Sequence, residues 1–384
     1  MNGKLTADDI REIARQCGFE LAGVAAAVPA DDRTRYHEWA AAGRAGKMGY
    51  LTDHRAVLRD DPRNLLAGVR SVISAGKLYQ TPWPHSTRFH DAERAWISRY
   101  AWGEDYHGVM RRGLLRLDGL LREAAGAAFE SRICVDTAPL LERSYARLAG
   151  LGWIGRNTCL INQRQGSWFF LGELLVTMEI APDAPPPDRC GTCMRCVEAC
   201  PTSALVAGQG LDATRCISYF TIELRGEIPE EQRAGIGAHV FGCDICQDVC
   251  PWNGRAPVTG DPAFAPRQFA PRLEEMAAIG EAEFGAMFRG TPLTRARYAG
   301  FLRNVAVAMG NARLEKFRAP LQRLAASEDA VVAGHARWAL SNMSVPNELG
   351  FSTNDETAAA RPLTDPSRSG LGVELRLRHS EPVE

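Results

Sequence analysis

Eight cysteines within one short segment are the residues best able to do chemistry in this sequence. They form the runs Cys190-x2-Cys193-x2-Cys196-x3-Cys200-Pro201 and Cys243-x2-Cys246-x3-Cys250-Pro251, with Cys216 between them. The first run has the bacterial ferredoxin spacing, whose fourth cysteine usually ligates the second of two clusters. A zinc site needs only four ligands, and no histidine stands at finger spacing here. The pattern therefore predicts two [4Fe–4S] clusters.

The two clusters require a division of the eight thiolates. The crossed arrangement assigns Cys190, Cys193, Cys196 and Cys250 to one cluster and Cys200, Cys216, Cys243 and Cys246 to the other. Prolines after Cys200 and Cys250 end the local turn and leave each last thiolate able to reach the neighbouring cluster. Two zinc knuckles or a disulfide framework are the alternatives, and an iron content of about eight atoms per chain would exclude both.

The bulk composition is that of a globular protein. A length of 384 residues favours two or three domains, and 45% hydrophobic with 24% charged residues is ordinary. The net charge of -1 gives no global preference for nucleic acid. We expect no membrane partner, since no run of 18 apolar residues and no export signal is present. The eleven cysteines then indicate a reducing compartment, and we expect the cytoplasm.

Several elements are predicted around this segment. Thr6 and Asp9 mark the start of a helix that Gly18 ends. Buried strands are expected at 18–27, 71–78 and 168–176, the last of them central. Helices are expected at the beginning of 36–50 and after Tyr106.

Asp136 is a single carboxylate at a strand-to-turn junction with apolar neighbours. It either caps a helix that begins at Pro139 or faces a dry pocket. In the second case its pKa would be raised, and it could donate a proton.

The C-terminal part is locally basic. Residues 286–325 hold eight Arg or Lys and one Glu, a net of +7. Leu302, Val305, Ala306 and Met309 form one helical stripe, from which Arg303 and Asn304 are expected to face away. A second stripe at 332–343 suggests a HEAT-like helical pair. A one-sided positive charge is expected of a phosphate-binding surface, although solvated helix faces are also often charged.

Several stretches together resemble the cobalamin-dependent epoxyqueuosine reductases over nearly all of residues 5–343. They are RDDPR (59–63), YH (106–107), VDTAP (135–139), GWIG (152–155), the eight cysteines, CISYFTIE (216–223) and CDICQ (243–247). The resemblance implies an enzyme that reduces epoxyqueuosine to queuosine at the wobble position of tRNA. Two [4Fe–4S] clusters would feed electrons to cobalamin, and an external low-potential donor would feed the clusters.

The resemblance also implies an α+β fold in several parts. Residues 1–181 would form a nitroreductase-like cobalamin-binding catalytic domain and 182–255 a ferredoxin-like double-cluster domain. Residues 256–344 would form a HEAT-like helical region that binds tRNA, and 345–384 a disordered tail. We expect a monomer.

The same resemblance assigns site residues. Asp136 matches the family's proton donor, while Arg59, Asn157, Ser218 and Asp244, with Asp136, would contact cobalamin. Charge and position rather than a motif make Arg295, Arg297, Arg303 and Asn304 the candidates for tRNA contact. Asp105-Tyr106-His107 lacks the glycine of the D-x-H-x-x-G motif, because Met110 stands there. We therefore expect base-off cobalamin without a histidine ligand, and a structural role for His107.

Three other functions deserve comparison. A reductive dehalogenase would use the same cofactors on an organohalide, but it usually carries a twin-arginine export signal and lacks a basic helical module. A ferredoxin-type electron-transfer subunit would not need about 180 residues before its cysteines. A pure RNA-binding module would not need two clusters.

Overall fold

An antiparallel sheet of four strands organises the N-terminal half of the protein. The computed structural model describes residues 5–208 and 210–343; the predicted disordered tail, 345–384, lies outside them. The strand order is β1-β2-β7-β4. Their bounds are Leu21–Ala26 (β1), Ser71–Leu78 (β2), Phe169–Val176 (β7) and Ser131–Cys134 (β4). All the residues of β2 are buried, as expected of a central strand.

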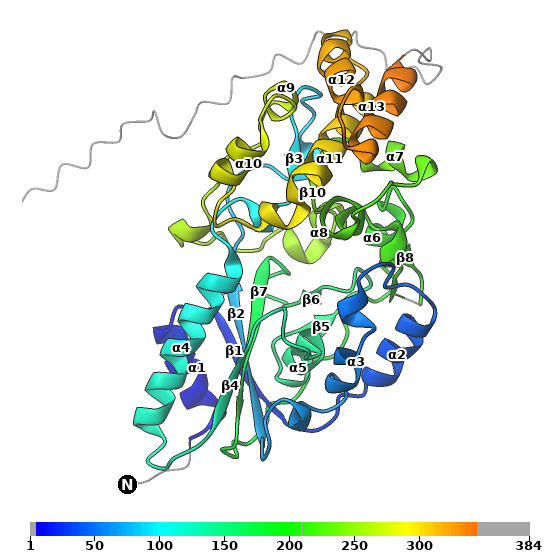
Figure 1. The fold of residues 1–384 in the computed structure, drawn as a ribbon. Helices are drawn as coiled ribbons and strands as arrows, with labels where there is room; N and C mark the ends of the chain where they lie inside the picture. The colour runs from blue at the N-terminus through cyan, green and yellow to red at the C-terminus, as the bar shows by residue number, and fades with distance from the viewer. Residues whose placement is uncertain (1–4, 209, 344–384) are drawn as a thin grey trace, which may run out of the picture. The chain divides into compact units, whose positions relative to one another are not determined.

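Helices cover both faces of this sheet (Figure 1). The helices α1 (Ala7–Gln16) and α4 (Tyr106–Ala124) pack on the face that carries Ile73 and Leu174. The short helix α5 (Glu142–Leu148) packs on the opposite face. At Gly172, an added Cβ would lie 2.9 Å from Leu114 of α4, so glycine permits the close approach of helix and strand.

The predicted elements of this half are largely present. Thr6 and Asp9 form the capping box of α1, the predicted strand 71–78 is β2, and 168–176 contains the central strand β7. The helix expected at the start of 36–50 begins earlier, as α2 (Arg33–Ala41). Turns follow it, and then come three short helices, η1 (Gly49–Leu51), α3 (Arg55–Leu58) and η2 (Pro62–Asn64).

The cysteine-rich segment consists of short elements. Its bounds are α6 (Arg195–Glu198), β8 (Leu205–Val206), β9 (Gly210–Leu211), η5 (Ala213–Arg215), the π-helical η6 (Tyr219–Glu223), α7 (Glu230–Ile236), β10 (His239–Phe241), α8 (Ile245–Asp248) and η7 (Pro251–Asn253). β10 pairs in parallel with β3 (Trp96–Ile97), which lies near η3 (Ser86–Arg88) and η4 (Arg99–Ala101). The hairpin β5 (Trp153–Ile154) and β6 (Leu160–Ile161) contributes Trp153 and Ile161 to a cluster with Cys250.

The C-terminal part is helical. It contains η8 (Pro262–Phe264), α9 (Leu273–Met276), α10 (Glu281–Met287), η9 (Pro292–Ala296), α11 (Arg297–Ala312), η10 (Glu315–Phe317), α12 (Arg318–Ala325) and α13 (Ala330–Met343). Both predicted stripes are confirmed as apolar contacts, because Val305, Ala336 and their neighbours share one core. The helix α11 is buried all round from Phe301 to Gly310. Within residues 5–208 and 210–343, no helix is long and apolar enough to cross a membrane.

Candidate functional site

Asp136 lies in the loop that follows β4, and its backbone adopts a left-handed conformation with φ +46°. Its backbone N–H donates to Oε1 of Glu142 at 2.5 Å. Its side chain remains 47% exposed. The capping alternative is wrong, because α5 begins at Glu142 after Leu141 and has no side-chain cap. The carboxylate is therefore available to a ligand.

His107 joins Asp136 to a second carboxylate. At the start of α4, its Nδ1 lies 2.7 Å from Oδ1 of Asp105 and its Nε2 lies 3.1 Å from Oδ2 of Asp136. The hydrogen bond to Asp105, followed by that to Asp136, raises the pKa of His107 to about 9. At neutral pH the ring is thus an imidazolium that donates from both nitrogens. The sequence interpretation of His107 as merely structural missed this contact.

The pKa of Asp136 shifts in the direction opposite to our expectation. Burial acts to raise it, but the hydrogen bond and charge of His107, together with the charge of Arg295, outweigh burial and leave the pKa lowered. The raised pKa expected of Asp136 in a dry pocket is therefore wrong. The exchangeable proton of the pair resides on His107, within hydrogen-bonding reach of the Asp136 carboxylate.

Aromatic rings and one arginine surround this pair. The ring of Tyr106 stacks on Phe170 with centroids 4.4 Å apart. Burial, and then the charge of Asp136, raises the pKa of both Tyr106 and Tyr100. Arg295 donates from Nε to Oε1 of Glu223 at 2.5 Å. Its guanidinium also lies 5.6 Å from the centre of the Tyr50 ring. Arg295, which we had selected for its charge, therefore belongs to the surroundings of Asp136.

The thiols influence one another in two groups. Burial raises the pKa of Cys250 to about 11, and the thiols that add to this shift include Cys190 and Cys196. Burial also raises the pKa of Cys196, and the charges of Cys190 and Cys193 add to this rise. This neighbourhood supports the first predicted ligand set.

The second group surrounds Cys243. Burial raises the pKa of the Cys243 thiol well above its usual value, and the charges of Cys216 and Cys200 add to the effect. The pKa of Cys246 is also raised, first by a hydrogen bond with Cys159 and then by burial. The charges of Cys243 and Cys216 add to this rise. Among the described residues, no three His, Cys, Asp or Glu side chains converge as on a single ion. A cubane, which is several ångströms across, does not require such convergence.

The predicted cofactor contacts have differing surroundings. Asn157 is 4% exposed and donates from Nδ2 to the carbonyl oxygen of Cys246 at 3.2 Å. Arg59 is 6% exposed and donates to the carbonyl oxygens of Tyr50 and Arg55. Ser218 precedes η6 and is partly exposed.

Asp244 is 2% exposed, and its carboxylate accepts hydrogen bonds from Ser98 Oγ, the Arg99 backbone N–H and Trp96 Nε1. These donors tie the thiol segment to the chain around β3. Asp244 also adds to the rise in the pKa of Tyr100, after burial and the charges of Asp136 and Glu223. The pKa of one partly buried tyrosine is thus influenced both by the Asp136 loop and by the residue beside Cys243.

Arg303 and Asn304 require a correction, because neither faces solvent. Arg303 is 1% exposed and donates to the carbonyl oxygens of Phe220, Leu224 and Gly226. Asn304 is fully buried and donates to those of Thr221 and Val240. Both side chains satisfy backbone groups in and around the π-helical turn η6, so the prediction that they contact RNA is wrong. Arg295 and Arg297 are exposed.

Two other carboxylates near Asp136 were not identified from the sequence. Glu142 accepts the Asp136 N–H, and Glu173 lies fully buried in β7. The signal for Glu173 was a single carboxylate within the apolar strand FFLGELLV.

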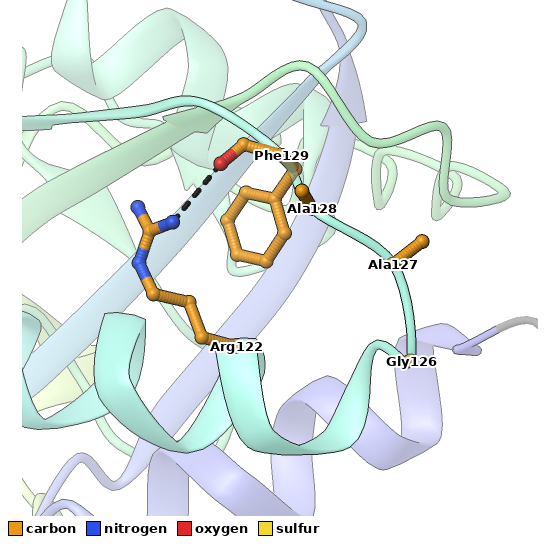
Figure 2. Close-up of a pocket in the computed structure, with 5 residues that line it drawn as sticks. All are labelled: Arg122, Gly126, Ala127, Ala128 and Phe129. Carbon is orange, nitrogen blue, oxygen red and sulfur yellow. Dashed lines mark hydrogen bonds between the residues drawn. The ribbon is translucent and has the colours of Figure 1, made fainter.

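A hollow of about 350 Å³ lies at the C-terminal end of α4. Figure 2 shows the residues that line it, which are Arg122, Gly126, Ala127, Ala128 and Phe129. His107 stands at the other end of this 19-residue helix, roughly 25 Å away at 1.5 Å per residue. The hollow is therefore not part of the site around Asp136.

Comparisons with known proteins identify two regions of the chain. Residues 189–253 match the family described as 4Fe-4S double cluster binding domain. Residues 59–137 match the family described as Epoxyqueuosine reductase QueG, DUF1730. The first region contains all eight predicted ligands, and the second ends just after Asp136.

Whole-chain relatives agree with these matches. An epoxyqueuosine reductase of Xanthomonas campestris pv. campestris is 41% identical over 340 residues, which cover 86% of this chain and 94% of the relative. A crystal structure of epoxyqueuosine reductase with an epoxyqueuosine-modified tRNA-Tyr stem loop has a TM-score of 0.80 at 29% identity, covering 88% of this chain and 90% of the other. A Bacillus subtilis epoxyqueuosine reductase, with an aspartate-bearing catalytic loop swung out of its active site, has a TM-score of 0.79 at 28% identity, covering 88% and 90%.

Proposed function

The chain belongs to the epoxyqueuosine reductase family, and on this premise we propose that it reduces epoxyqueuosine to queuosine at the wobble position of tRNA. Conversion of the epoxide to an alkene consumes two electrons and two protons and releases water. No side chain supplies such electrons, so bound cofactors must carry them. The two [4Fe–4S] clusters of residues 189–253 provide electrons singly, and an external low-potential donor replenishes them.

Base-off cobalamin is the second cofactor that we propose. When bound, its cobalt would accumulate both reducing equivalents at one atom. The residues present fit such a group, because both ring nitrogens of His107 are engaged by carboxylates and the Asp136 side chain is 47% exposed. No imidazole of this loop is then free to ligate cobalt, whereas the carboxylate can face a bound ligand.

We assign the cofactor contacts to five residues. Arg59, Asn157, Ser218 and Asp244 would border the corrin together with Asp136. Asn157 also holds the backbone of Cys246. Asp244 also orders the chain near Arg99. With these contacts, the proposed cofactor would lie between the clusters and the proton donor.

Asp136 is the proposed proton donor to the epoxide oxygen. The pKa of Asp136 is lowered and that of His107 is raised to about 9, so the proton of the pair resides on His107. A corrin and a nucleoside packed against the carboxylate would exclude water and favour the neutral acid. His107 would pass its proton to Asp136 across the 3.1 Å hydrogen bond as that environment forms.

The tRNA would approach from the side of Arg295 and Arg297. Both are exposed, and Arg295 contributes to the electrostatic environment of Asp136. Phosphate contacts there would position the anticodon stem, while the target nucleoside leaves the base stack to reach the site. Catalysis would then belong to residues 1–181 and electron supply to residues 182–255. Binding of RNA would belong to the HEAT-like helices of residues 256–344. We assign a nitroreductase-like topology to the first part, and a monomer in a reducing cytoplasm to the whole.

The observation that best carries this proposal is a series of contacts between Asp136 and the thiol segment. His107, which is hydrogen-bonded to Asp136, stacks on Tyr106, and the Tyr106 ring lies 6.1 Å from the ring of Tyr100. The backbone N–H of Arg99, the residue before Tyr100, donates to the carboxylate of Asp244 beside Cys243. The test is anaerobic reconstitution with iron, sulfide and cobalamin, followed by incubation with an epoxyqueuosine stem loop and a low-potential reductant. Nucleoside mass analysis should detect queuosine, with protein reconstituted without cobalamin as the control. Absence of cobalamin binding, or of conversion by the fully loaded protein, would refute the proposal.

A further inference from the structure

Glu173 is an acidic side chain in the middle of a central strand. It is fully buried in β7, and neither carboxyl oxygen has a hydrogen-bond partner of ordinary geometry among the described residues. The strand register places Ser74 of β2 on one side and Cys134 of β4 on the other. The Ser74 hydroxyl also lacks such a partner there. An ionised carboxylate in these surroundings would be strongly unfavourable unless it is neutralised.

A second acidic side chain, Glu142, lies on the helix that packs against this face of β7. Side chains alternate along β7, so Glu173 points to the same face as Leu175, against which α5 packs. Glu142 is the first residue of α5. Its Oε1 also accepts the backbone N–H of Asp136 at 2.5 Å. Glu142 therefore links a buried carboxyl group to the loop that carries Asp136.

The electrostatics of the pair favour a retained proton. Burial, and then the charge of Asp136, raises the pKa of Glu142 to about 8. Burial, and then the charge of Glu142, raises the pKa of Glu173 well above its usual value. Arg143, also on α5, acts to lower the pKa of Glu142. On β4, Cys134 adjoins Glu173, and the charge of Arg132 acts to lower the pKa of Cys134. Burial and the like charge of the neighbouring carboxylate both favour the neutral acid, so the two groups are expected to retain at least one proton at neutral pH.

We propose that Glu142 and Glu173 are positioning residues for Asp136, a proton-retaining carboxyl pair that clamps the Asp136 backbone in its left-handed conformation. A non-glycine residue at φ +46° is strained and needs a specific contact to hold it. Loss of the last proton would leave Glu142 charged and repelled by the carboxylates of Glu173 and Asp136, which would weaken the clamp. The catalytic consequence rests on the proposed function, because it requires Asp136 to be the proton donor.

The clamp can be tested without substrate by hydrogen–deuterium exchange. Glu142→Ala removes the acceptor of the Asp136 N–H, whereas Glu142→Gln keeps an oxygen there. We expect exchange in a peptide spanning Asp136 to accelerate about tenfold in Glu142→Ala and to stay near the wild-type rate in Glu142→Gln. Glu123→Gln, on the exposed surface of α4, is the control for loss of a carboxylate. Unchanged exchange in Glu142→Ala would overturn the proposal.

The retained proton has a separate signature in stability. A carboxyl group whose folded pKa is raised stabilises the fold at low pH, and this contribution declines as pH rises toward the folded value. The melting midpoint of the wild-type holoprotein should therefore fall relative to Glu173→Gln between about pH 6 and pH 9. Glu173→Leu provides a second neutral variant in case the amide disturbs the strand. Parallel midpoints for wild type and both variants would overturn the retained proton.

Turnover supplies the functional readout. In single-turnover reactions on the epoxyqueuosine stem loop, Glu142→Ala should lower the rate constant about tenfold or more without weakening tRNA binding, and Glu142→Gln should restore most of it. Glu173→Gln should retain its rate to a higher pH than wild type does. Wild-type protein that is inactive on this substrate would refute the proposed function, while the exchange and melting experiments would still test the clamp. Equal rates for Glu142→Ala and wild type would overturn its role in positioning.

Discussion

Replacement of Arg303 by methionine should damage the fold and leave the RNA surface intact. Its guanidinium donates to three backbone carbonyl oxygens, those of Phe220, Leu224 and Gly226, and also to Asn304. An unsatisfied buried acceptor costs about 1–3 kcal/mol. Part of this cost is offset because the substitution also removes a buried cation. Burial disfavours that cation and lowers the pKa of Arg303 to about 10. We expect a net destabilisation on the order of 3 kcal/mol.

The assay compares Arg303→Met with Arg297→Met, whose wild-type side chain is exposed on the same helix. Thermal unfolding of anaerobic holoprotein should show a midpoint lowered by roughly 5–10 °C for Arg303→Met. Arg297→Met should melt like wild type, within the ±0.5 kcal/mol or so typical of surface substitutions. Titration with a labelled stem loop should show weaker binding by Arg297→Met, with the salt slope reduced by about one.

The opposite pattern would refute this assignment. If Arg303→Met melted with the wild type and bound the stem loop weakly, its hydrogen bonds to the η6 region would have no measurable structural role. If Arg297→Met bound RNA as tightly as wild type at every salt concentration, the RNA surface would have to be sought elsewhere. The paired design separates a loss of folded protein from a loss of phosphate contacts.

The remaining predictions concern the proton donor, its partner and the clusters. Asp136→Asn should keep its iron and corrinoid but lose about 10²–10⁴-fold in single-turnover rate, and a rate within tenfold of wild type would contradict its role. His107 has a folded pKa of about 9, above its usual 6.5. Its charged form therefore contributes stability that is complete below about pH 6.5 and lost as pH rises through about 9. Turnover should decline across the same range, and His107→Gln should lack that limb of the pH–rate profile. Cys190→Ser combined with Cys250→Ser should retain about four iron atoms per chain, because the crossed assignment places both in one cluster. Loss of both clusters, measured as iron and sulfide, would favour the uncrossed arrangement.

Local chemistry was the most predictable part of this protein. Cysteine spacing specifies cluster ligands because the short C-x2-C turns present neighbouring thiols to one cubane. The strand at 168–176 was likewise predicted to be central because a central strand is apolar on both faces. Asp136 could be singled out as a carboxylate at the end of a strand. None of these interpretations required knowledge of a distant partner.

Helical periodicity predicted the wrong environment for polar side chains whose hydrogen-bond partners are backbone carbonyl groups. The stripe of α11 correctly placed Val305 and Met309 in the core. It assigned Arg303 and Asn304 to solvent, since polar residues usually face water. In the structure, the opposing surface consists of carbonyl oxygens in and around η6, and such acceptors carry no side-chain signature in a sequence.

The sequence by itself determined which residue types supply chemistry: eight thiols at cluster spacing, a carboxylate after β4 and a basic C-terminal region. Only the tertiary structure decided how those groups are tuned. It brings His107 against Asp136 from 29 residues away and sets Glu142 between Asp136 and the buried Glu173. The reason is physical: ligand spacing is a property of adjacent residues, whereas protonation and burial depend on neighbours that the chain acquires only when it folds.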